Sequence, residues 1–569
     1  FSLTAKPNAL STAPQSAPKK IELTIDSKPK PFVYDSEAQK KEQKRLEEEK
    51  KQQEIKEKRE RIRAEEEAKR KALEKPVQQQ EIVIPKPQEI APKEQVSQPK
   101  NKNSKRVAET KAQREQRLER FAKEETQQRE SFKQEKDKQK PLSVIFSGHV
   151  DHGKSSMSGH ILVNTGHIDE RQMEKLKMEA AKTVGESWGY AFAMDACQEE
   201  REKGKTVESA RATFTTPSGR RVVLLDSPGH KGFIGSMIEA AAQADVGVLV
   251  TSARKGEFEA GLERNGQTAE HALILFISGV KNLIIAVNKM DDPTCQYSQQ
   301  RFEQIQNDLK AYLTKTVGYQ EKNLQFIPVS ALTGENLTEQ LTEESPLKKW
   351  YSGPALIDLI NDVKIPKRDV GGFARACVSG KYRDQGYFAV CKVEKGQFKK
   401  QEKYLLMPQG EEIQILQIED EVGNQIEVAS AGENCRFQVD EKSFDTIADG
   451  CVLCDSKHFC EVSKTFVVKF LCVDCPTVLT PGFLASVHIN TAVSPCKIKS
   501  VLGVLDQNGK IDKALPKLVK PGQSALIEFE CDKELCVNKF ELEGFLGRVL
   551  VRHETTTIGI GQIVKVCYE

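Results

Sequence analysis

The first 140 residues contain no glycine, although the whole chain has 36, and they contain none of its 14 cysteines. The same stretch carries 36 Lys and Arg against 26 Asp and Glu. A segment with so much charge and so few large apolar side chains cannot bury a sizeable core. We therefore expect residues 1–140 to be a charged extension, largely disordered or in single helices, and the folded domains to begin at residue 141.

Within this extension, residues 36–75 are almost all Lys, Glu, Arg, Gln and Ala, most of them strong helix formers. Their few apolar positions sustain no heptad, so a solvated single helix is favoured over a coiled coil. Residues 76–102 are rich in Pro and Gln, which predicts a linker. A second charged helix is expected over 104–138, ended by Pro141.

The remaining 429 residues carry 50 basic and 57 acidic side chains. At ~150 residues per domain, this length suggests about three domains. No apolar run approaches the ~18–20 residues that span a bilayer, so no membrane contact is expected. Cysteines in a large chain rich in Lys and Glu fit a reducing compartment, which predicts a cytoplasmic protein.

Short apolar strands alternate with helical segments over residues 141–366, which is typical of an α/β domain with a mostly parallel sheet. The predicted strands cover residues 142–146, 221–225, 244–250, 283–287 and 324–329. From residue 367 onward helices are no longer predicted, and short alternating strands between turn residues indicate β-barrels. A charged, cysteine-bearing stretch near 455–463 divides them into one barrel over 367–461 and another over 462–569.

The first predicted strand runs into the pattern Gly-x4-Gly-Lys-Ser, from Gly148 to Ser155, and a predicted helix over 154–165 follows. Glycines let backbone N–H groups wrap phosphates, and the helix N-terminus adds partial positive charge. Lys154 is expected to reach the β- and γ-phosphates of a nucleotide, and the Ser155 hydroxyl to bind Mg²⁺. The other residues of this loop expected to contact the nucleotide are Val150, Asp151, His152, Gly153 and Ser156.

Two further loops follow predicted strands and carry polar residues. Asp226 ends the strand 221–225, where a carboxylate can hold a Mg²⁺-bound water. The N–H of Gly229 can sense a γ-phosphate. After the strand 324–329, a backbone N–H of the next three residues can meet O6 of guanine; these are Ser330, Ala331 and Leu332.

The loop after the strand 283–287 predicts which base is bound. The carboxylate of Asp291 can accept both N–H donors on the Watson–Crick edge of guanine, which adenine cannot supply. Asn288 can hold the loop and reach the base, and the stem of Lys289 can cover the ring. All four loops lie at carboxyl ends of strands, where α/β sheets bind ligands. The sequence therefore predicts a site for GTP or GDP with Mg²⁺.

With these motifs in this order, residues 141–569 resemble the translational GTPases, whose signature Pro-Gly-His is present at residues 228–230. The resemblance implies a P-loop GTPase domain followed by two β-barrels, with hydrolysis stimulated by the ribosome. It also implies that His230 orients the attacking water, that Val150 lies near it as an apolar gate, and that the Thr206 hydroxyl joins Mg²⁺ in the GTP state.

Within these GTPases the chain is most similar to the eukaryotic peptide-chain release factor subunit 3 family. The similarity lies in residues 198–208, in residues 289–294 and in the long charged extension. It implies a monomeric GTP hydrolase of translation termination that binds the class-I release factor and delivers it to the ribosome at stop codons. Alternatives are the ribosome-rescue GTPase that pairs with Pelota, an aminoacyl-tRNA carrier like elongation factor 1-alpha, and a scaffold protein built on the charged helices.

The resemblance has departures. The family usually has Ala and Thr where this chain has His152 and Ser156, and the C-terminal pattern Gly-Arg-Phe-Thr-Leu-Arg-Asp is changed at residues 547–553. That segment is where the family contacts the class-I factor, so Arg548 and Arg552 are the expected partner-binding residues.

Two weaker features remain. Residues 30–34 faintly resemble a motif that recruits poly(A)-binding protein. Four cysteines have the spacing of a zinc ribbon, but the second pair ends a predicted barrel strand, so buried cysteines are favoured over zinc. They are Cys451, Cys454, Cys472 and Cys475.

Overall fold

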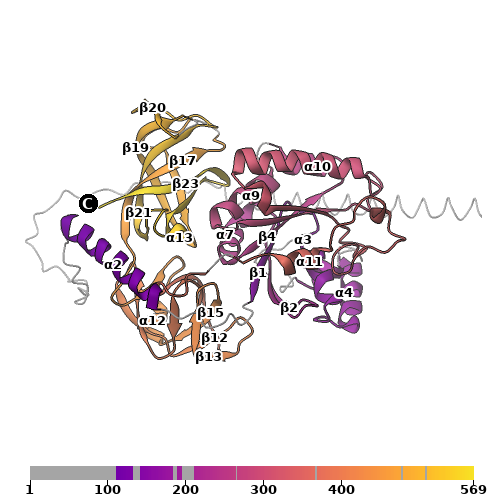
Figure 1. Cartoon of the computed structure of the whole chain (residues 1–569), viewed down its shortest axis with the longest axis horizontal. Coiled ribbons are helices and arrows are strands. Elements are labelled where there is room, and N and C mark those ends of the chain that lie inside the picture. The colour runs from indigo at the N-terminus through magenta and orange to yellow at the C-terminus, as the bar shows by residue number, and fades with distance from the viewer. Residues whose placement is uncertain are drawn as a thin grey trace, which may run out of the picture. The chain divides into compact units, whose positions relative to one another are not determined.

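A computed structural model describes residues 111–131, 141–183, 189–194, 210–263, 266–365, 368–475, 478–506 and 509–568 (Figure 1). Residues 101–569 form one compact unit. Several expectations fall outside the described residues: the helix over 36–75, the linker over 76–102, the motif at 30–34, and residues 198–208 with Thr206.

The α/β domain has a six-stranded sheet in the order β2-β3-β1-β4-β5-β6. All neighbours are parallel except β2 and β3, which pair antiparallel. The strands are β1 (Leu142–Ser147), β2 (Ala210–Thr215), β3 (Arg221–Asp226), β4 (Val246–Ser252), β5 (Asn282–Asn288) and β6 (Leu324–Pro328). The five predicted strands are confirmed to within two residues at each end. Only the edge strand β2 was not predicted, because its half-exposed sequence lacks an apolar run.

Helices cover both faces of this sheet. Side chains alternate between faces along each strand, so Val144 and Phe146 belong to one core and Ile145 to the other. The helices are α3 (Lys154–Asn164), α4 (Glu170–Thr183), α5 (Gly189–Phe192), α7 (Ile234–Gln243), α8 (Glu257–Leu262), α9 (Gln267–Ser278), α10 (Gln299–Tyr312) and α11 (Leu356–Asp362). Short helical turns are η2 (Lys231–Phe233), η3 (Leu313–Val317), η4 (Glu321–Asn323) and η5 (Pro346–Lys349).

The first barrel is an eight-stranded antiparallel sheet in the order β11-β10-β16-β7-β8-β15-β12-β13, completed by the pair β14-β9. Its elements are β7 (Arg375–Arg383), β8 (Tyr387–Lys395), β9 (Gln397–Lys399), β10 (Lys403–Met407), β11 (Glu411–Gln414), β12 (Gln417–Glu419), β13 (Gln425–Ile426), β14 (Val428–Ser430), β15 (Asn434–Val439), α12 (Glu441–Thr446) and β16 (Val452–Asp455).

The second barrel closes on itself, because β18 pairs with β22 on one side and β19 on the other. Its elements are β17 (Val462–Cys472), β18 (Leu484–Ile489), β19 (Ala492–Leu505), β20 (Ile511–Ala514), β21 (Ser524–Cys536), α13 (Gly544–Gly547), β22 (Arg548–His553) and β23 (Thr556–Cys567). The expected α/β domain with two β-barrels is thus confirmed. The expectation that helices end at residue 367 is wrong for α12 and α13. Asp440 caps α12 by accepting a hydrogen bond from the N–H of Ser443, a local signal that overrides the strand pattern.

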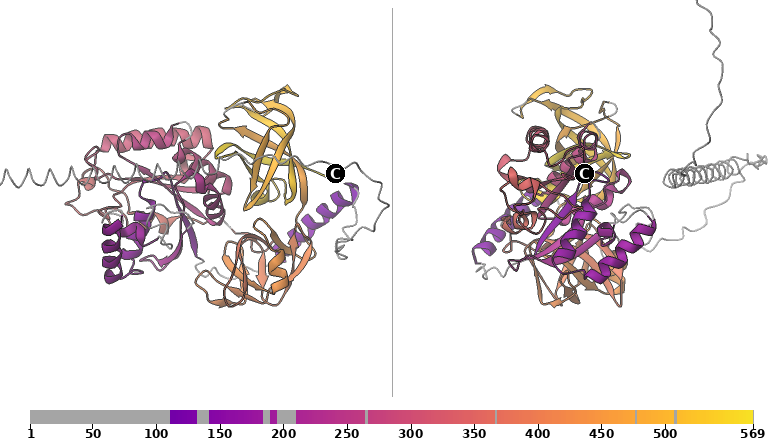
Figure 2. Two further views of the ribbon diagram at one scale, coloured as in Figure 1. Left: turned by 180° about the vertical axis from the view of Figure 1, so that it is seen from behind. Right: turned by 90° about the vertical axis from the view of Figure 1, so that its right-hand side faces the viewer.

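Helix α2 (Lys111–Ser131) is the described part of the extension, inside the expected span of 104–138. Figures 1 and 2 show it beside the two barrels, on the side away from the α/β domain. Phe121 is buried against Phe373, His458 and Phe459 of the barrel surface. The charged helix expected over 104–138 is confirmed for these residues, and its docking through Phe121 was not predicted.

Charged side chains flank this aromatic contact. Arg117 donates to Glu461 at 2.7 Å, and Arg129 donates to Asp369 at 2.5 Å. Glu125 accepts from the N–H of Phe373 at 3.1 Å. The docking is therefore specific in position, with ion pairs on both sides of one buried ring.

No described helix is both long and apolar enough to cross a membrane.

Candidate nucleotide-binding site

The loop between β1 and α3 has the backbone form that wraps an anion. Gly148 has φ 145°, and a Cβ there would lie 2.2 Å from the carbonyl oxygen of Val250. Asp151 and Gly153 also have positive φ, of 61° and 90°. Helix α3 then begins at Lys154, so its free N–H groups lie at the end of this loop.

Lys154 is buried inside the loop. Its Nζ donates to the carbonyl oxygen of His149 at 2.9 Å, and a Cβ on Gly229 would lie 2.4 Å from it. Burial lowers the pKa of Lys154 to about 8, against the opposing charges of Asp226 and Asp151. A buried ammonium with little compensation is well placed to bind the phosphates of a nucleotide.

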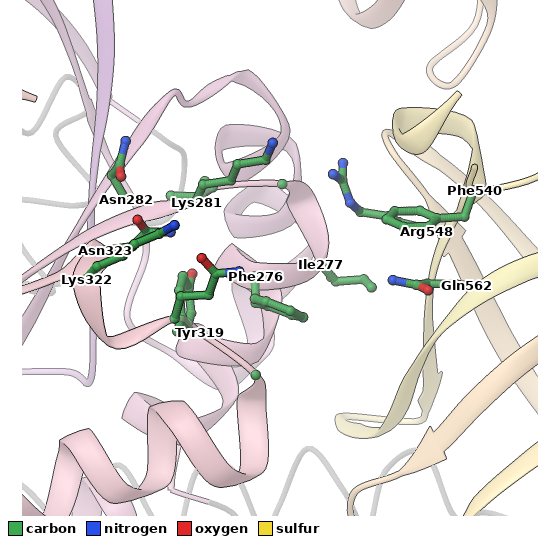
Figure 3. Close-up of a pocket in the computed structure, with 14 residues that line it drawn as sticks. Phe276, Ile277, Lys281, Asn282, Tyr319, Lys322, Asn323, Phe540, Arg548 and Gln562 are labelled. Atoms are coloured by element: carbon green, nitrogen blue, oxygen red, sulfur yellow. The ribbon is translucent and has the colours of Figure 1, made fainter. Parts of the chain in front are cut away.

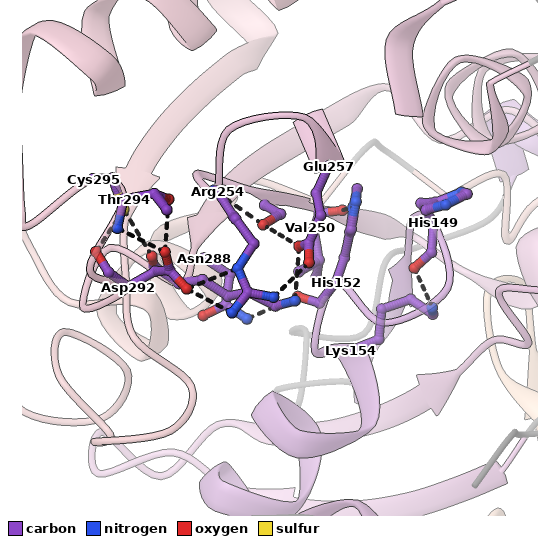
Figure 4. A network of polar contacts seen from close by, with 12 residues as sticks. His149, His152, Lys154, Val250, Arg254, Glu257, Asn288, Asp292, Thr294 and Cys295 are labelled. Carbon is purple, nitrogen blue, oxygen red and sulfur yellow. Dashed lines mark hydrogen bonds and ion pairs between the residues drawn. The ribbon is translucent and has the colours of Figure 1, made fainter. Parts of the chain in front are cut away.

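Asn288 ties three of the predicted loops together, and Figure 4 shows it beside His152 of the phosphate loop. Its Nδ2 donates to the carbonyl oxygen of His152 at 2.8 Å, and its Oδ1 accepts from the N–H of Ala331 at 2.8 Å. It is fully buried, at the end of β5. The phosphate loop and the two predicted base loops are thereby held in one fixed relation.

The predicted base-reading residue Asp291 follows in the same loop. Its Oδ1 is buried and has no hydrogen-bond partner among the described residues. Such an atom calls for a donor, which the Watson–Crick edge of guanine supplies.

The side chain of Lys289 is held by a network of hydrogen bonds around Glu257. Its Nζ donates to Glu257 at 2.8 Å. Although burial alone would raise the pKa of Glu257, hydrogen bonds from Lys289, Ser252 and Arg254 lower it to about 2. The carboxylate is therefore ionised at neutral pH and fixes the direction of the lysine stem.

The last predicted loop lies beside these residues. Ser330 and Ala331 are buried, whereas Leu332 is 56% exposed at the rim. The Ala331 N–H is engaged by Asn288, so this loop is positioned by the same amide that holds the phosphate loop.

The remaining predicted residues lie on the phosphate side. Asp226 is fully buried at the end of β3, directly beside Phe146 of β1. Ser155 and Ser156 are half-buried in the first turn of α3. His230 is exposed and caps η2, where its Nδ1 accepts from the N–H of Gly232 at 3.1 Å.

Comparison with known proteins agrees with this geometry. A family model described as the elongation factor Tu GTP binding domain matches residues 139–364, and one described as GTP-eEF1A C-terminal domain-like matches residues 465–564. The chain belongs to the translational GTPase family.

Curated relatives of this chain include the eukaryotic peptide chain release factor GTP-binding subunits of Schizosaccharomyces pombe and Zygosaccharomyces rouxii. They are 37% and 38% identical to it over 426 and 428 residues. Each match covers 75% of this chain and 64% of the relative, so the chain spans slightly less than two thirds of their length. The fold is also that of the S. cerevisiae Ski7 GTPase-like domain bound to GTP, at 19% identity and a TM-score of 0.60, over 74% of this chain and 97% of that one.

The side chain of His152 in the phosphate loop is buried. Its Nδ1 lies 3.3 Å from the carbonyl oxygen of Val250. Burial, with the nearby His149 and Lys154, lowers the pKa of His152 to about 3, so the ring is neutral. The ring thus packs the loop against β4.

One set of residues at this site was not predicted from the sequence. Helix α9 opens with buried polar side chains: Gln267, Thr268, Glu270 and His271. His271 accepts from the N–H of Gly148 at 2.9 Å, and Gln267 accepts from the N–H of Val150 at 3.4 Å. The signal in the sequence is a polar run at the start of an otherwise apolar helix.

Arg548 and Arg552, expected to contact a partner, both lie against the α/β domain. Arg552 has its Nη2 3.6 Å from the carboxylate of Glu270. The guanidinium of Arg548 lies against Gly279, where a Cβ would be 2.6 Å from its Nη1. Arg548 also lines a cavity of about 620 Å³ between the α/β domain and the second barrel, with Lys281 pointing toward the same gap (Figure 3).

The four zinc-spaced cysteines of the chain divide among three hydrophobic clusters, and Cys454 lies in a cluster with Cys460 and Cys536. Cys451 belongs to the core of the first barrel, and Cys472 and Cys475 to the core of the second. Burial raises the pKa of Cys472 to about 12, whereas a zinc ligand must be a thiolate. Within the described ranges no group of three or more His, Cys, Asp and Glu side chains is placed to hold a metal ion.

Proposed function

We propose that the chain is a GTPase of translation termination. It binds GTP and GDP with Mg²⁺, hydrolyses GTP when the ribosome engages it, and delivers a class-I release factor to stop codons. The observation that carries the proposal is the buried, unpartnered Oδ1 of Asp291 in a loop that Asn288 ties to the phosphate loop. The 37–38% identity to proteins named release factor GTP-binding subunits supports the assignment to termination.

Asp291 selects guanine, because a carboxylate accepts two N–H donors that adenine does not present. Lys154 and the N–H groups at the start of α3 bind the phosphates. The N–H of Gly229, which lies next to Lys154, senses the γ-phosphate. Phosphoryl transfer needs positioning and charge stabilisation more than covalent help, and these groups supply both.

The oxygen donors present fit Mg²⁺, which prefers hydroxyl and carboxylate oxygens together with water. Ser155 and Asp226 are the residues that hold it, and the charge of Asp226 also acts on Lys154. Thr206 is proposed as the third protein group from its place in the sequence. When bound, the ion neutralises charge on the phosphate oxygens.

His230 is proposed to position the attacking water. Because its Nδ1 accepts from Gly232, the proton of the neutral ring lies on Nε2, on an exposed side chain. An exposed N–H can donate to water or to a phosphate oxygen once the ribosome closes the site, with Val150 as the apolar gate beside it.

The proposed role of His230 in GTP hydrolysis is tested with the variant His230→Ala. We expect unchanged affinity for GTP, measured with a fluorescent analogue, and loss of the ribosome-stimulated part of hydrolysis, because the contacts of this side chain, to Gly232 and Phe233, lie within its own segment. Ribosome-stimulated turnover at the level of the unaltered chain would remove His230 from the mechanism.

The partner is tested by purifying the tagged chain from a eukaryotic lysate in GTP and in GDP. Recovery of the class-I release factor supports termination. Recovery of Pelota or of charged tRNA in its place would instead identify a rescue factor or a tRNA carrier. A peptide of residues 1–40 tests the weaker proposal of poly(A)-binding protein recruitment, which fails if nothing is retained.

A further inference from the structure

Helix α3 carries a buried histidine that contacts the loop after β6. The Nδ1 of His160 lies 3.1 Å from the carbonyl oxygen of Ala331, and the side chain is 7% exposed. A carbonyl oxygen only accepts hydrogen bonds, so Nδ1 carries the proton and donates. Burial lowers the pKa of His160, and the ring is therefore neutral at pH 7. The carbonyl group of Ala331 is thus held by a side chain that comes from a different element.

This bond also sets the direction of the next backbone N–H. The carbonyl of Ala331 and the N–H of Leu332 belong to one planar peptide group and point in opposite directions. The two preceding N–H groups are already used. That of Ser330 donates to the carbonyl oxygen of Glu335 at 3.2 Å. That of Ala331 donates to Asn288. Within the described residues the N–H of Leu332 has no such bond, so it is the donor that this loop offers to O6 of guanine.

An aromatic ring from outside the four nucleotide loops covers His160. The ring of Tyr190, in α5, stacks on the imidazole with centroids 4.1 Å apart and an angle of 5° between the planes. The ammonium of Lys177, in α4, lies over the Tyr190 ring at 5.0 Å from its centroid. Because the rings are stacked almost parallel, Tyr190 restricts the rotation of the imidazole and thereby the direction of its Nδ1–H.

Glycines allow the backbone to approach this stacked pair closely. A Cβ on Gly159 of α3 would lie 1.8 Å from the carbonyl oxygen of Tyr190, so α3 and α5 pack as they do only with glycine at this position. On the side of the loop, a Cβ on Gly334 would lie 2.5 Å from the Nε2 of His160. The two rings are therefore confined by backbone from α3 and from the loop after β6.

We propose that His160 and Tyr190 are positioning residues for the recognition of guanine, and that they aim the N–H of Leu332 at O6 of the base. The inference rests on the proposed function in one respect, which is that the loops bind a guanine nucleotide. A peptide group whose carbonyl accepts a hydrogen bond is also a stronger donor, because neighbouring hydrogen bonds polarise one another. Tyr190 thereby contributes to base selection from a segment that is not one of the nucleotide loops.

The experiment compares the binding of GDP and of 6-thioguanosine diphosphate to the full chain at pH 7. The second ligand keeps both N–H donors that Asp291 accepts, but its 6-position carries sulfur, which is a weak acceptor. Each ligand is titrated in competition with a fluorescent GDP analogue. The ratio of the two dissociation constants reports the bond to O6, whereas a general loss of loop structure weakens both ligands alike.

We expect Tyr190→Ala to weaken the binding of GDP roughly 3- to 10-fold and to leave that of the sulfur analogue almost unchanged, because the peptide group loses its fixed direction. Tyr190→Phe keeps the ring and should restore the affinity for GDP. His160→Ala should reduce the discrimination between the two ligands at least as much as Tyr190→Ala does.

Tyr382→Ala is the matched control. Tyr382 also stacks on an aromatic ring, that of Phe388, with centroids 5.4 Å apart and an angle of 12°, but it lies in the first barrel. This variant should bind both ligands as the unaltered chain does. Thermal unfolding of the two alanine variants without nucleotide shows whether the loss of a stacked tyrosine lowers stability equally in both.

Equal weakening of both ligands by Tyr190→Ala would overturn the inference, because the ring would then support the loop as a whole. Unchanged binding of GDP to this variant, or the same weakening in Tyr382→Ala, would overturn it too. So would an unaltered chain that binds both diphosphates equally well, because O6 would then not be read. If the unaltered chain fails to prefer GDP over ADP, the proposed nucleotide-binding function itself is wrong.

Discussion

The nucleotide loops and the docked helix α2 both use charged and polar side chains at buried positions, but they differ in how the contacts arise. The loops follow adjacent strands of one sheet, so parallel pairing brings residues such as Asn288 and His152 together. Helix α2 contacts residues more than 200 positions away, as in the bond from Arg117 to Glu461. Its binding surface exists only once the barrels have folded.

The two regions also differ in energy. The amide of Asn288 satisfies two buried backbone groups, and each of these costs about 1–3 kcal/mol if left unpaired. The Arg129–Asp369 pair of α2 is partly exposed, and exposed pairs contribute about 0–1 kcal/mol each. The Arg117–Glu461 pair is more deeply buried, with side chains 11% and 4% exposed. The difference teaches that the loops are held by a few buried bonds to backbone groups, and α2 by one aromatic ring together with the buried pair of Arg117 and Glu461.

The largest expected effect is in the loops. Asn288→Ala should lower the free energy of unfolding of the α/β domain by about 3 kcal/mol, because two buried backbone groups lose their partners. Added GDP should no longer raise its stability in urea titrations. Asn282→Ala is the control, since Asn282 makes a single exposed bond to the carbonyl oxygen of Lys364. Equal losses from the two variants would refute the special role of Asn288.

The next effect concerns the ring that anchors α2. Phe121→Ala should weaken docking by about 2 kcal/mol, the transfer free energy of a buried aromatic side chain. The protection of α2 amides in hydrogen exchange should fall accordingly, by about 30-fold. Gln116→Ala, on the same helix but exposed, should change nothing. If α2 keeps its protection without Phe121, the ion pairs carry the docking and the comparison is reversed.

A smaller effect is expected from pH at the phosphate loop. Burial lowers the pKa of Lys154 to about 8, so the free loop loses its ammonium as pH rises through 8. Phosphates bind the charged form, and GDP affinity should therefore fall about fourfold between pH 7 and 8.5. Calorimetric titration measures this below the range in which guanine itself ionises. An affinity that stays constant or rises over this interval would contradict the assignment of Lys154 to the phosphates.

The smallest effect is expected at the rim of the α2 contact. Arg129→Ala removes the pair with Asp369 and should cost about 0.5 kcal/mol of docking, since the two side chains are 46% and 33% exposed. Raising the salt concentration should reproduce this change in the unaltered chain and have little further effect on the variant. A loss of docking free energy as large as that of Phe121→Ala would show that water and salt do not screen the Arg129–Asp369 pair.

Much of the α/β domain was predictable because its signals are local. Five apolar runs predicted five strands, and the glycines, Lys154, Asn288 and Asp291 follow them at fixed positions. The docking of α2 was not predictable from the sequence. A charged helix that carries Phe121 can be solvated or bound, and no local pattern distinguishes the two. The orientation of Arg548 and Arg552 toward α9 depends on how two domains pack, which no short motif records.

The account depends most on the claim that Asp291 reads guanine. Asp291→Asn replaces one acceptor oxygen with an N–H₂ donor, which repels the N–H donors of guanine and matches the 2-carbonyl of xanthine. This variant should therefore bind GTP about 100-fold more weakly than the unaltered chain does, and it should bind xanthosine triphosphate more tightly. Unchanged GTP affinity with no gain for xanthosine triphosphate would contradict the account.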